Sequence, residues 1–184
     1  MRAAELFQTI PNLIFVLTIV VILGSTLTNI VIASGKGGTG KTLVATSLAL
    51  TAAERGACAL LDADVEEPNA HLFLKPLITE SEEVTLPVPE IDRERCDACG
   101  RCAEVCAFHA LAVVRGQALV FPSLCHGCGS CARQCPQRAV SEVPKQLGRV
   151  ERGRAGSIHF VHGILDVGEA MATPVIRRLK DATL

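Results

Sequence analysis

Eight of the nine cysteines in this 184-residue chain lie between positions 96 and 135. Four of them follow the spacing C-x2-C-x2-C-x3-C, and the next four repeat it. A secreted disulfide scaffold would spread its cysteines over a short chain behind a cleavable signal. Two tight groups inside a longer sequence instead favour metal ligation in a reducing compartment. The ninth cysteine, Cys58, has apolar neighbours and is expected to be a small buried residue.

The doubled spacing, with Pro136 directly after the last cysteine, resembles bacterial ferredoxins that carry two 4Fe–4S clusters. In that signature the fourth cysteine of each run binds the other cluster. The resemblance therefore implies two ligand sets, namely Cys96, Cys99, Cys102 and Cys135 for one cluster and Cys125, Cys128, Cys131 and Cys106 for the other. Ala107 replaces the proline expected after the first run. Zinc is the competing interpretation, but structural zinc sites separate their C-x2-C arms by longer gaps.

A second motif lies at residues 35–42, which read GKGGTGKT and match the phosphate-binding loop G-x-x-x-x-G-K-[ST]. An apolar strand is expected before it, at 29–35, and a helix after it, at 42–55. Backbone N–H groups of such a loop hold phosphate oxygens at the positive end of the helix. We therefore expect the loop to bind ATP through Gly35, Lys36, Gly37, Gly38, Thr39, Gly40, Lys41 and Thr42. Lys41 is expected to reach the β- and γ-phosphates, and the Thr42 hydroxyl to bind Mg²⁺.

The additional lysine, Lys36, makes the loop resemble the deviant Walker A motif of the MinD/ParA/Mrp superfamily, the CobQ/CobB/MinD/ParA nucleotide-binding domain. The resemblance implies a homodimer in which Lys36 reaches the partner's nucleotide, and it makes Lys36, Lys41 and Asp64 the catalytic residues. A strand is expected at 57–62, and the family carries a D-x-D here, matched by Asp62 and Asp64. Asp62 is expected to hold Mg²⁺ through water and Asp64 to orient the attacking water. The alternative is a polar strand end with aspartates in turn or N-cap positions.

Helical and strand patterns return after Pro144, with a strand expected at 158–161 and a helix at 168–180. The fold class expected is therefore α/β, an incomplete P-loop NTPase with a parallel sheet, formed by residues 29–89 and 146–184. An α+β module of the bacterial two-cluster ferredoxin type is inserted at 90–145, with a short hairpin around Arg115-Gly116 between its cysteine loops. The polar residues of the last segment are interpreted as structural or partner-facing: His159, His162, Asp166 and Glu169.

The family continues into a D-x-P-P-G switch that this sequence lacks, so the chain is expected to be an N-terminal fragment. By itself it is not expected to hydrolyse ATP. Residues 1–28 form an apolar extension, interpreted either as a spurious start or, through 8–28, as a membrane helix. The expected location is the cytoplasm, or a membrane anchor facing it.

Taken together, the two motifs predict an ATP-binding iron–sulfur protein that passes electrons to a redox partner protein under nucleotide control. The alternative is a simple ferredoxin-type electron carrier, or a cluster carrier, with a non-hydrolysing P-loop half. The net charge of −1 and an aromatic content of 3% argue against a nucleic-acid partner. A positioning ATPase would need an amphipathic membrane helix or a basic DNA surface, and the sequence shows neither pattern.

Overall fold

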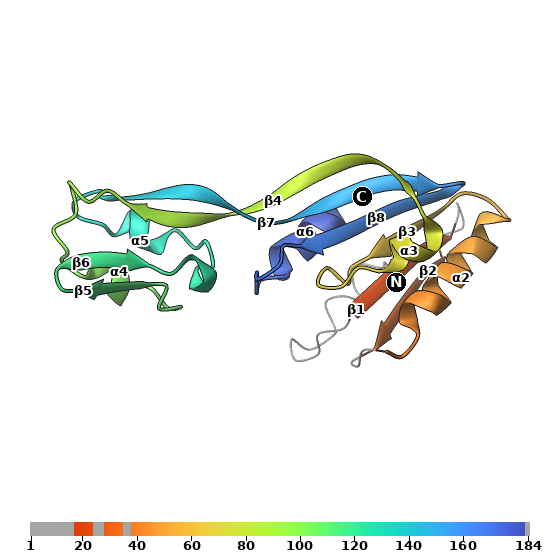
Figure 1. The fold of residues 1–184 in the computed structure, drawn as a ribbon, viewed down its shortest axis with the longest axis horizontal. Helices are drawn as coiled ribbons and strands as arrows, with labels where there is room; N and C mark the ends of the chain where they lie inside the picture. The colour runs from red at the N-terminus through yellow and green to blue at the C-terminus, as the bar shows by residue number, and fades with distance from the viewer. Residues whose placement is uncertain (1–16, 24–27, 35–37, 183–184) are drawn as a thin grey trace. The chain divides into compact units, whose positions relative to one another are not determined.

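The computed structural model describes residues 17–23, 28–34 and 38–182, and its chain divides into two compact units (Figure 1). The first unit contains the described residues up to Val84, together with 148–166 and 172–182. The second contains 85–147 and 167–171. Two long strands, β4 (Leu77–Ile91) and β7 (Val140–Ala155), have residues in both units.

A six-stranded sheet runs in the order β2-β1-β3-β8-β7-β4. Its other strands are β1 (Leu17–Leu23), β2 (Thr28–Ser34), β3 (Cys58–Asp62) and β8 (Ile158–Leu165). With the helices described below, this sheet confirms the α/β class. The strands at 29–35, 57–62 and 158–161 form as expected, and the last extends four residues further.

The sheet is mixed, so the prediction of a parallel sheet holds for the pair β3 and β8 and fails for three other pairs. β3 and β8 pair in parallel, whereas β1 pairs antiparallel with both β2 and β3, and β7 pairs antiparallel with β8. A parallel pair needs a long crossover, whereas strands joined by a short turn run antiparallel. The Gly156-Ser157 turn between β7 and β8 is of this short kind.

The apolar stretch near the N-terminus contributes a strand, β1, over Leu17–Leu23. The helix considered for residues 8–28 is therefore not formed there, and residues 8–16 and 24–27 of that range lie outside the described part. Among the residues that the structure describes, no helix combines the length and apolar character needed to cross a bilayer.

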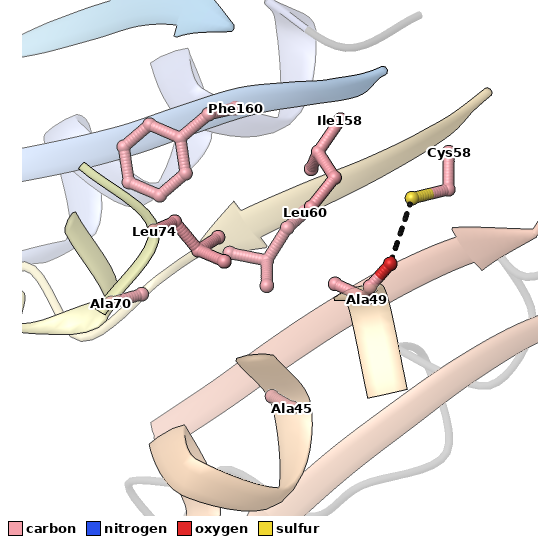
Figure 2. Packing of buried hydrophobic residues seen from close by; sticks show 8 residues of the cluster. All are labelled: Ala45, Ala49, Cys58, Leu60, Ala70, Leu74, Ile158 and Phe160. Atoms are coloured by element: carbon pink, nitrogen blue, oxygen red, sulfur yellow. Dashed lines mark hydrogen bonds between the residues drawn. The ribbon is translucent and has the colours of Figure 1, made fainter. Parts of the chain in front are cut away.

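Two helices cover one face of the sheet, α2 (Lys41–Ala53) and α3 (Ala70–Leu74). The sequence of α2 is rich in alanine and leucine, and Ala45 and Ala49, four residues apart, let its backbone approach the strands closely. Figure 2 shows the buried cluster between helices and sheet, which consists of Ala45, Ala49, Cys58, Leu60, Ala70, Leu74, Ile158 and Phe160. The Cys58 thiol donates a hydrogen bond to the Ala49 carbonyl at 3.4 Å, so the ninth cysteine is part of this core.

Helix α6 (Thr173–Asp181) packs against the opposite face of β8. It starts later than the expected residue 168, with Pro174 in its first turn, where a missing N–H costs nothing. A Cβ atom at Gly163 would lie 2.7 Å from Val65 and 3.0 Å from Val175, so glycine is needed for this close packing. Neighbouring strand residues point to opposite faces. His162 therefore faces α3, whereas Gly163 faces α6.

The second unit is built from two copies of one backbone pattern, 29 residues apart. Short helices α4 (Arg101–Glu104) and α5 (Ser130–Arg133) occupy equivalent places, each after a glycine with positive φ, Gly100 and Gly129. The expected hairpin forms between them from β5 (Leu111–Val114) and β6 (Gln117–Val120), and a 3₁₀ turn, η1, follows at Pro122–Leu124.

Equivalent hydrogen bonds join the two copies. The Phe121 N–H donates to the Ala110 carbonyl, and the Asp92 N–H donates to the Ala139 carbonyl, both at 2.8 Å. In each bond the donor lies four residues before one cysteine run, and the acceptor lies four residues after the other run. The two copies are therefore interlocked through their backbones, and neither is complete without the other.

Substitution of Gly153 by alanine is expected to destabilise the first unit. A Cβ atom at this position of β7 would lie 2.2 Å from the Leu77 carbonyl oxygen, which is backbone and has little freedom to move. We expect a loss of about 1–3 kcal/mol in the free energy of unfolding, measured by urea denaturation. Glu83→Ala, at an exposed position of β4, is the control and should change it by less than about 0.5 kcal/mol. Equal midpoints for both variants would contradict the close approach.

Candidate functional site

The described part of the phosphate loop ends at the start of α2. Gly35, Lys36 and Gly37 lie outside the described residues, so the expectations for them stay predictions. Gly38 and Gly40 have φ of +71° and +79°, the left-handed region that glycine adopts without strain. These two glycines and Thr39 are exposed to solvent, and Lys41 is the first residue of the helix. The helix N-terminus therefore opens to an exposed, glycine-shaped loop, as phosphate binding requires.

Asp62 ends β3 and is completely buried. Its Oδ1 accepts the Asp64 N–H and its Oδ2 accepts the Ala70 N–H, both at 3.1 Å. Burial raises the pKa of this carboxyl, while the N–H groups of Ala70 and Asp64 and the nearby His162 oppose that rise. With both oxygens bonded to backbone, Asp62 holds the acidic loop 63–69 in place.

Asp64 is half-buried in that loop and accepts the Glu67 N–H at 3.4 Å. Burial raises the pKa of its carboxyl, and the Glu67 N–H and the Lys41 ammonium lower it. Lys41 thus lies within electrostatic reach of Asp64. Of the two predicted aspartates, Asp64 is the one whose pKa the Lys41 ammonium lowers, whereas Asp62 fixes the loop that carries Asp64.

Two further ionisable residues, the buried His162 and the half-buried Glu151, lie in register with Asp62 across three adjacent strands. Asp62 pairs with His162 between β3 and β8, and Glu151 pairs with His162 between β7 and β8. The His162 Nε2 lies 2.9 Å from the Glu151 Oε2, and the Arg149 Nε lies 2.6 Å from the other oxygen of that carboxylate. Sequence reasoning missed this row, because the strand that carries Glu151 was not predicted.

The eight clustered cysteines line two pockets in the second unit. One pocket is lined by Cys96, Cys99, Cys102 and Cys135 and the other by Cys125, Cys128, Cys131 and Cys106. Each pocket thus takes three cysteines from one copy of the spacing and the fourth from the other copy. Apolar side chains such as Val113 and Leu111 complete the walls, and Glu142 lies at the second pocket.

Electrostatic effects also show that the thiols of each pocket are neighbours. Burial raises the pKa of the Cys102 thiol, and the nearby Cys96 and Cys135 raise it further. Burial likewise raises the pKa of Cys131, with smaller contributions from Cys125 and Cys128. Thiolates this close repel one another unless positive charge, such as that of iron, lies between them.

Backbone N–H groups point at the fourth cysteine of each run. The Ala110 N–H donates to the Cys106 sulfur at 3.2 Å, and the Ala139 N–H donates to the Cys135 sulfur at 3.3 Å. These bonds stabilise thiolate over thiol, and hydrogen bonds to ligand sulfur tune the potential of an iron–sulfur cluster. In the second pocket the Ser130 N–H and hydroxyl lower the pKa of the Cys128 thiol.

No group of three His, Cys, Asp or Glu side chains in the described residues is arranged to hold a single metal ion. A 4Fe–4S cluster would instead be held by four separate cysteine thiolates, such as those that line each pocket. Four thiols and apolar walls make a donor set that fits a sulfur-ligated cluster and suits a hard cation such as Mg²⁺ poorly.

A known protein family matches most of the chain. Residues 30–179 match the family model of the CobQ/CobB/MinD/ParA nucleotide binding domain. The chain is also 35% identical over 156 residues to an uncharacterized protein of Methanocaldococcus jannaschii. That alignment covers 83% of this chain and 53% of the archaeal protein, so the chain spans about half the length of this relative.

The stability of the chain is expected to depend on pH through Glu151. Burial alone would raise the pKa of this carboxyl, but hydrogen bonds from Arg149 and His162 hold it below its usual value. Ionised Glu151 therefore stabilises the fold above its ordinary pKa of about 4.3, and this stabilisation is lost as the pH falls through the lower pKa of the folded state.

Glu151→Gln should accordingly have a lower unfolding midpoint than the unmodified chain near pH 7, with the gap closing below about pH 4. Thermal unfolding followed by circular dichroism between pH 3 and pH 7 measures this. Glu104→Gln is the control, since Glu104 forms an exposed ion pair with Arg101. A gap for Glu151→Gln that stays constant with pH would show that the carboxylate charge has no part in stability.

Proposed function

Because the chain belongs to the CobQ/CobB/MinD/ParA nucleotide-binding domain family, we propose that its first unit binds Mg-ATP and that its second unit carries two 4Fe–4S clusters. Electron transfer through the clusters to a redox partner protein is controlled by the nucleotide state. The observation that carries the proposal is the pair of four-thiol pockets, each completed by a cysteine of the other motif copy, in a chain with a phosphate-binding loop.

The first unit supports the nucleotide half of the proposal. Left-handed glycines shape the loop, and α2 begins beside it with Lys41. Lys41 would bind the β- and γ-phosphates, Thr42 would bind Mg²⁺, and Asp64 would orient a water molecule for attack on the γ-phosphate. Asp62 would support Mg²⁺ binding through the loop that it fixes. Lys36 would complete the site across a homodimer, where a second cation neutralises charge on the γ-phosphate.

The second unit supports the redox half. Bound clusters would supply one-electron chemistry, and the chain supplies the ligands, the N–H donors at Cys106 and Cys135 and the apolar walls that limit water. Cys99 and Cys128 are exposed, so one edge of each pocket is open to an approaching partner. All nine cysteines are free thiols in the described residues, which agrees with the reducing conditions of a cytoplasmic location.

The ligand grouping predicts a distinctive response to paired substitutions. After anaerobic reconstitution with iron and sulfide, the unmodified chain should bind about eight iron atoms. Cys102→Ser with Cys135→Ser removes two ligands of one pocket and should leave about four, whereas Cys102→Ser with Cys106→Ser damages both pockets and should leave close to none. Iron analysis and electron paramagnetic resonance of the reduced protein measure this.

Cys58→Ala is the matched control, since Cys58 belongs to the core of the other unit and should leave the iron content unchanged. If the closely spaced pair at 102 and 106 left four irons and the distant pair at 102 and 135 left none, each run would hold its own cluster. Stoichiometric zinc in protein purified without oxygen would overturn the iron–sulfur assignment.

Nucleotide binding is expected to depend on Lys41. Calorimetric titration with Mg-ADP should show binding to the unmodified chain, and Lys41→Ala should weaken it by about tenfold or more, because a charge-assisted contact to phosphate is lost. Lys75→Ala, an exposed lysine after α3, serves as control. Nucleotide control predicts further that Mg-ATP shifts the potential of the reconstituted clusters. Binding without any shift would favour a plain electron carrier with a non-hydrolysing P-loop half.

A further inference from the structure

We infer that His162 is a positioning residue for the acidic loop of the nucleotide site, held by Glu151 and paired in strand register with Asp62. The inference rests on the proposed nucleotide binding. It assigns a role to a buried histidine that lies outside the P-loop motif and outside both cysteine runs.

The three side chains form one row because their strands are neighbours in register. β3, β8 and β7 lie side by side in the sheet, and Asp62, His162 and Glu151 occupy directly paired positions. Asp62 is fully buried and His162 is only 3% exposed. The row lies at the carboxyl end of β3, the end at which α/β folds place their ligands, while β8 continues past His162 to Leu165.

The row places one histidine, His162, between two carboxylates, Asp62 and Glu151. A carboxylate accepts hydrogen bonds, so His162 donates through Nε2 to Glu151, whose other oxygen accepts a bond from Arg149. Taking the charge of Asp62 out of water is costly unless nearby groups compensate for it, and His162 lies close enough to do so. His162 therefore lies between Glu151, which its Nε2 contacts, and Asp62, with which it pairs in the strand register.

Two aromatic rings pack against the His162 imidazole, one from α3 and one from β8. The His71 ring of α3 lies 5.4 Å away between centroids, and the Phe160 ring lies 5.0 Å away. Three buried polar atoms around the row have no hydrogen-bond partner in the described residues, the Nδ1 atoms of His71 and His162 and the Oδ1 of Asn69. Buried polar groups are nearly always bonded, so these atoms are where a change at His162 would be felt first.

The position of Asp64 depends on this row. Asp62 accepts the Asp64 N–H and the Ala70 N–H, so the two ends of the acidic loop are bonded to a single carboxylate. Any shift of that carboxylate would move Asp64 relative to Lys41, and so relative to Mg-nucleotide when it is bound. His162 thus acts on the nucleotide site through Asp62 and touches no substrate itself.

The test compares His162→Gln with His159→Gln in the full chain. Both histidines are on β8, but His159 is exposed and bonded to Arg154, which makes it a matched control. Affinity for ADP is measured by calorimetry with Mg²⁺ and again with EDTA, beside the unfolding midpoint of each protein. We expect His162→Gln to weaken Mg-ADP binding by about tenfold and Mg-free binding by less than about twofold, because the phosphate loop does not need the acidic loop whereas Mg²⁺ does.

An equal loss with and without Mg²⁺, or no loss, would make His162 a purely structural residue and overturn the inference while leaving the proposed function intact. Absence of ADP binding to the unmodified chain would overturn the proposed function and the inference together. If His162→Gln does not fold, Glu151→Gln decides, because it keeps the histidine and weakens its anchor. A loss of about threefold confined to the Mg²⁺ titration is then expected, and an unchanged Mg²⁺ effect would contradict the inference.

Discussion

The parallel pairing of β3 with β8 is the interaction on which the rest of the molecule depends. It joins strands that lie on either side of the cysteine-rich segment in the sequence, and most of the core in Figure 2 comes from these two strands and the helices above them. Because Cys58 pairs with Ile158, the segment between them is a closed loop of the first unit, whatever it contains. The closure entropy of such a loop grows only slowly with its length, so a complete second unit is tolerated there.

The same pairing explains why the sequence predicted the phosphate loop and the acidic loop but did not predict the residues that position the acidic loop. The glycines, Lys41 and the two aspartates follow one another within a short stretch and form a recognisable motif. His162 and Glu151 come from strands far along the chain, and only the sheet brings them to Asp62. β4 and β7 were not predicted. Prolines at 87, 89 and 144 and many charged residues interrupt the apolar alternation by which a strand is predicted from sequence. Proline is compatible with an edge strand such as β4, which needs fewer ladder bonds.

The second unit shows how a repeated backbone constrains residues that are not themselves repeated. Ala98 and Gly127 hold equivalent positions with φ of +57° and +64°, and His109 and Arg138 do so with +53° and +51°. A left-handed conformation at a residue with a side chain is disfavoured and persists only when its surroundings impose it. Local sequence does not reveal this strain at Ala98, His109 or Arg138, whereas the cysteine spacing alone predicts where the chain must turn. The ligand sets themselves stay predictions until iron is measured.

Strand β7 has a consequence for how such a sequence can change. It carries Glu142 at the second cysteine pocket and Glu151 beside His162. Side chains alternate between the two faces of a strand, so inserting or deleting one residue between these glutamates would turn one of them to the wrong face. The intervening residues are themselves constrained, because Leu147 and Val150 are buried and a Cβ atom at Gly148 would lie 2.1 Å from the Ile164 carbonyl oxygen. Homologous proteins should therefore preserve both the residue count of this segment and its small and apolar positions, the opposite of what an ordinary connecting loop would show.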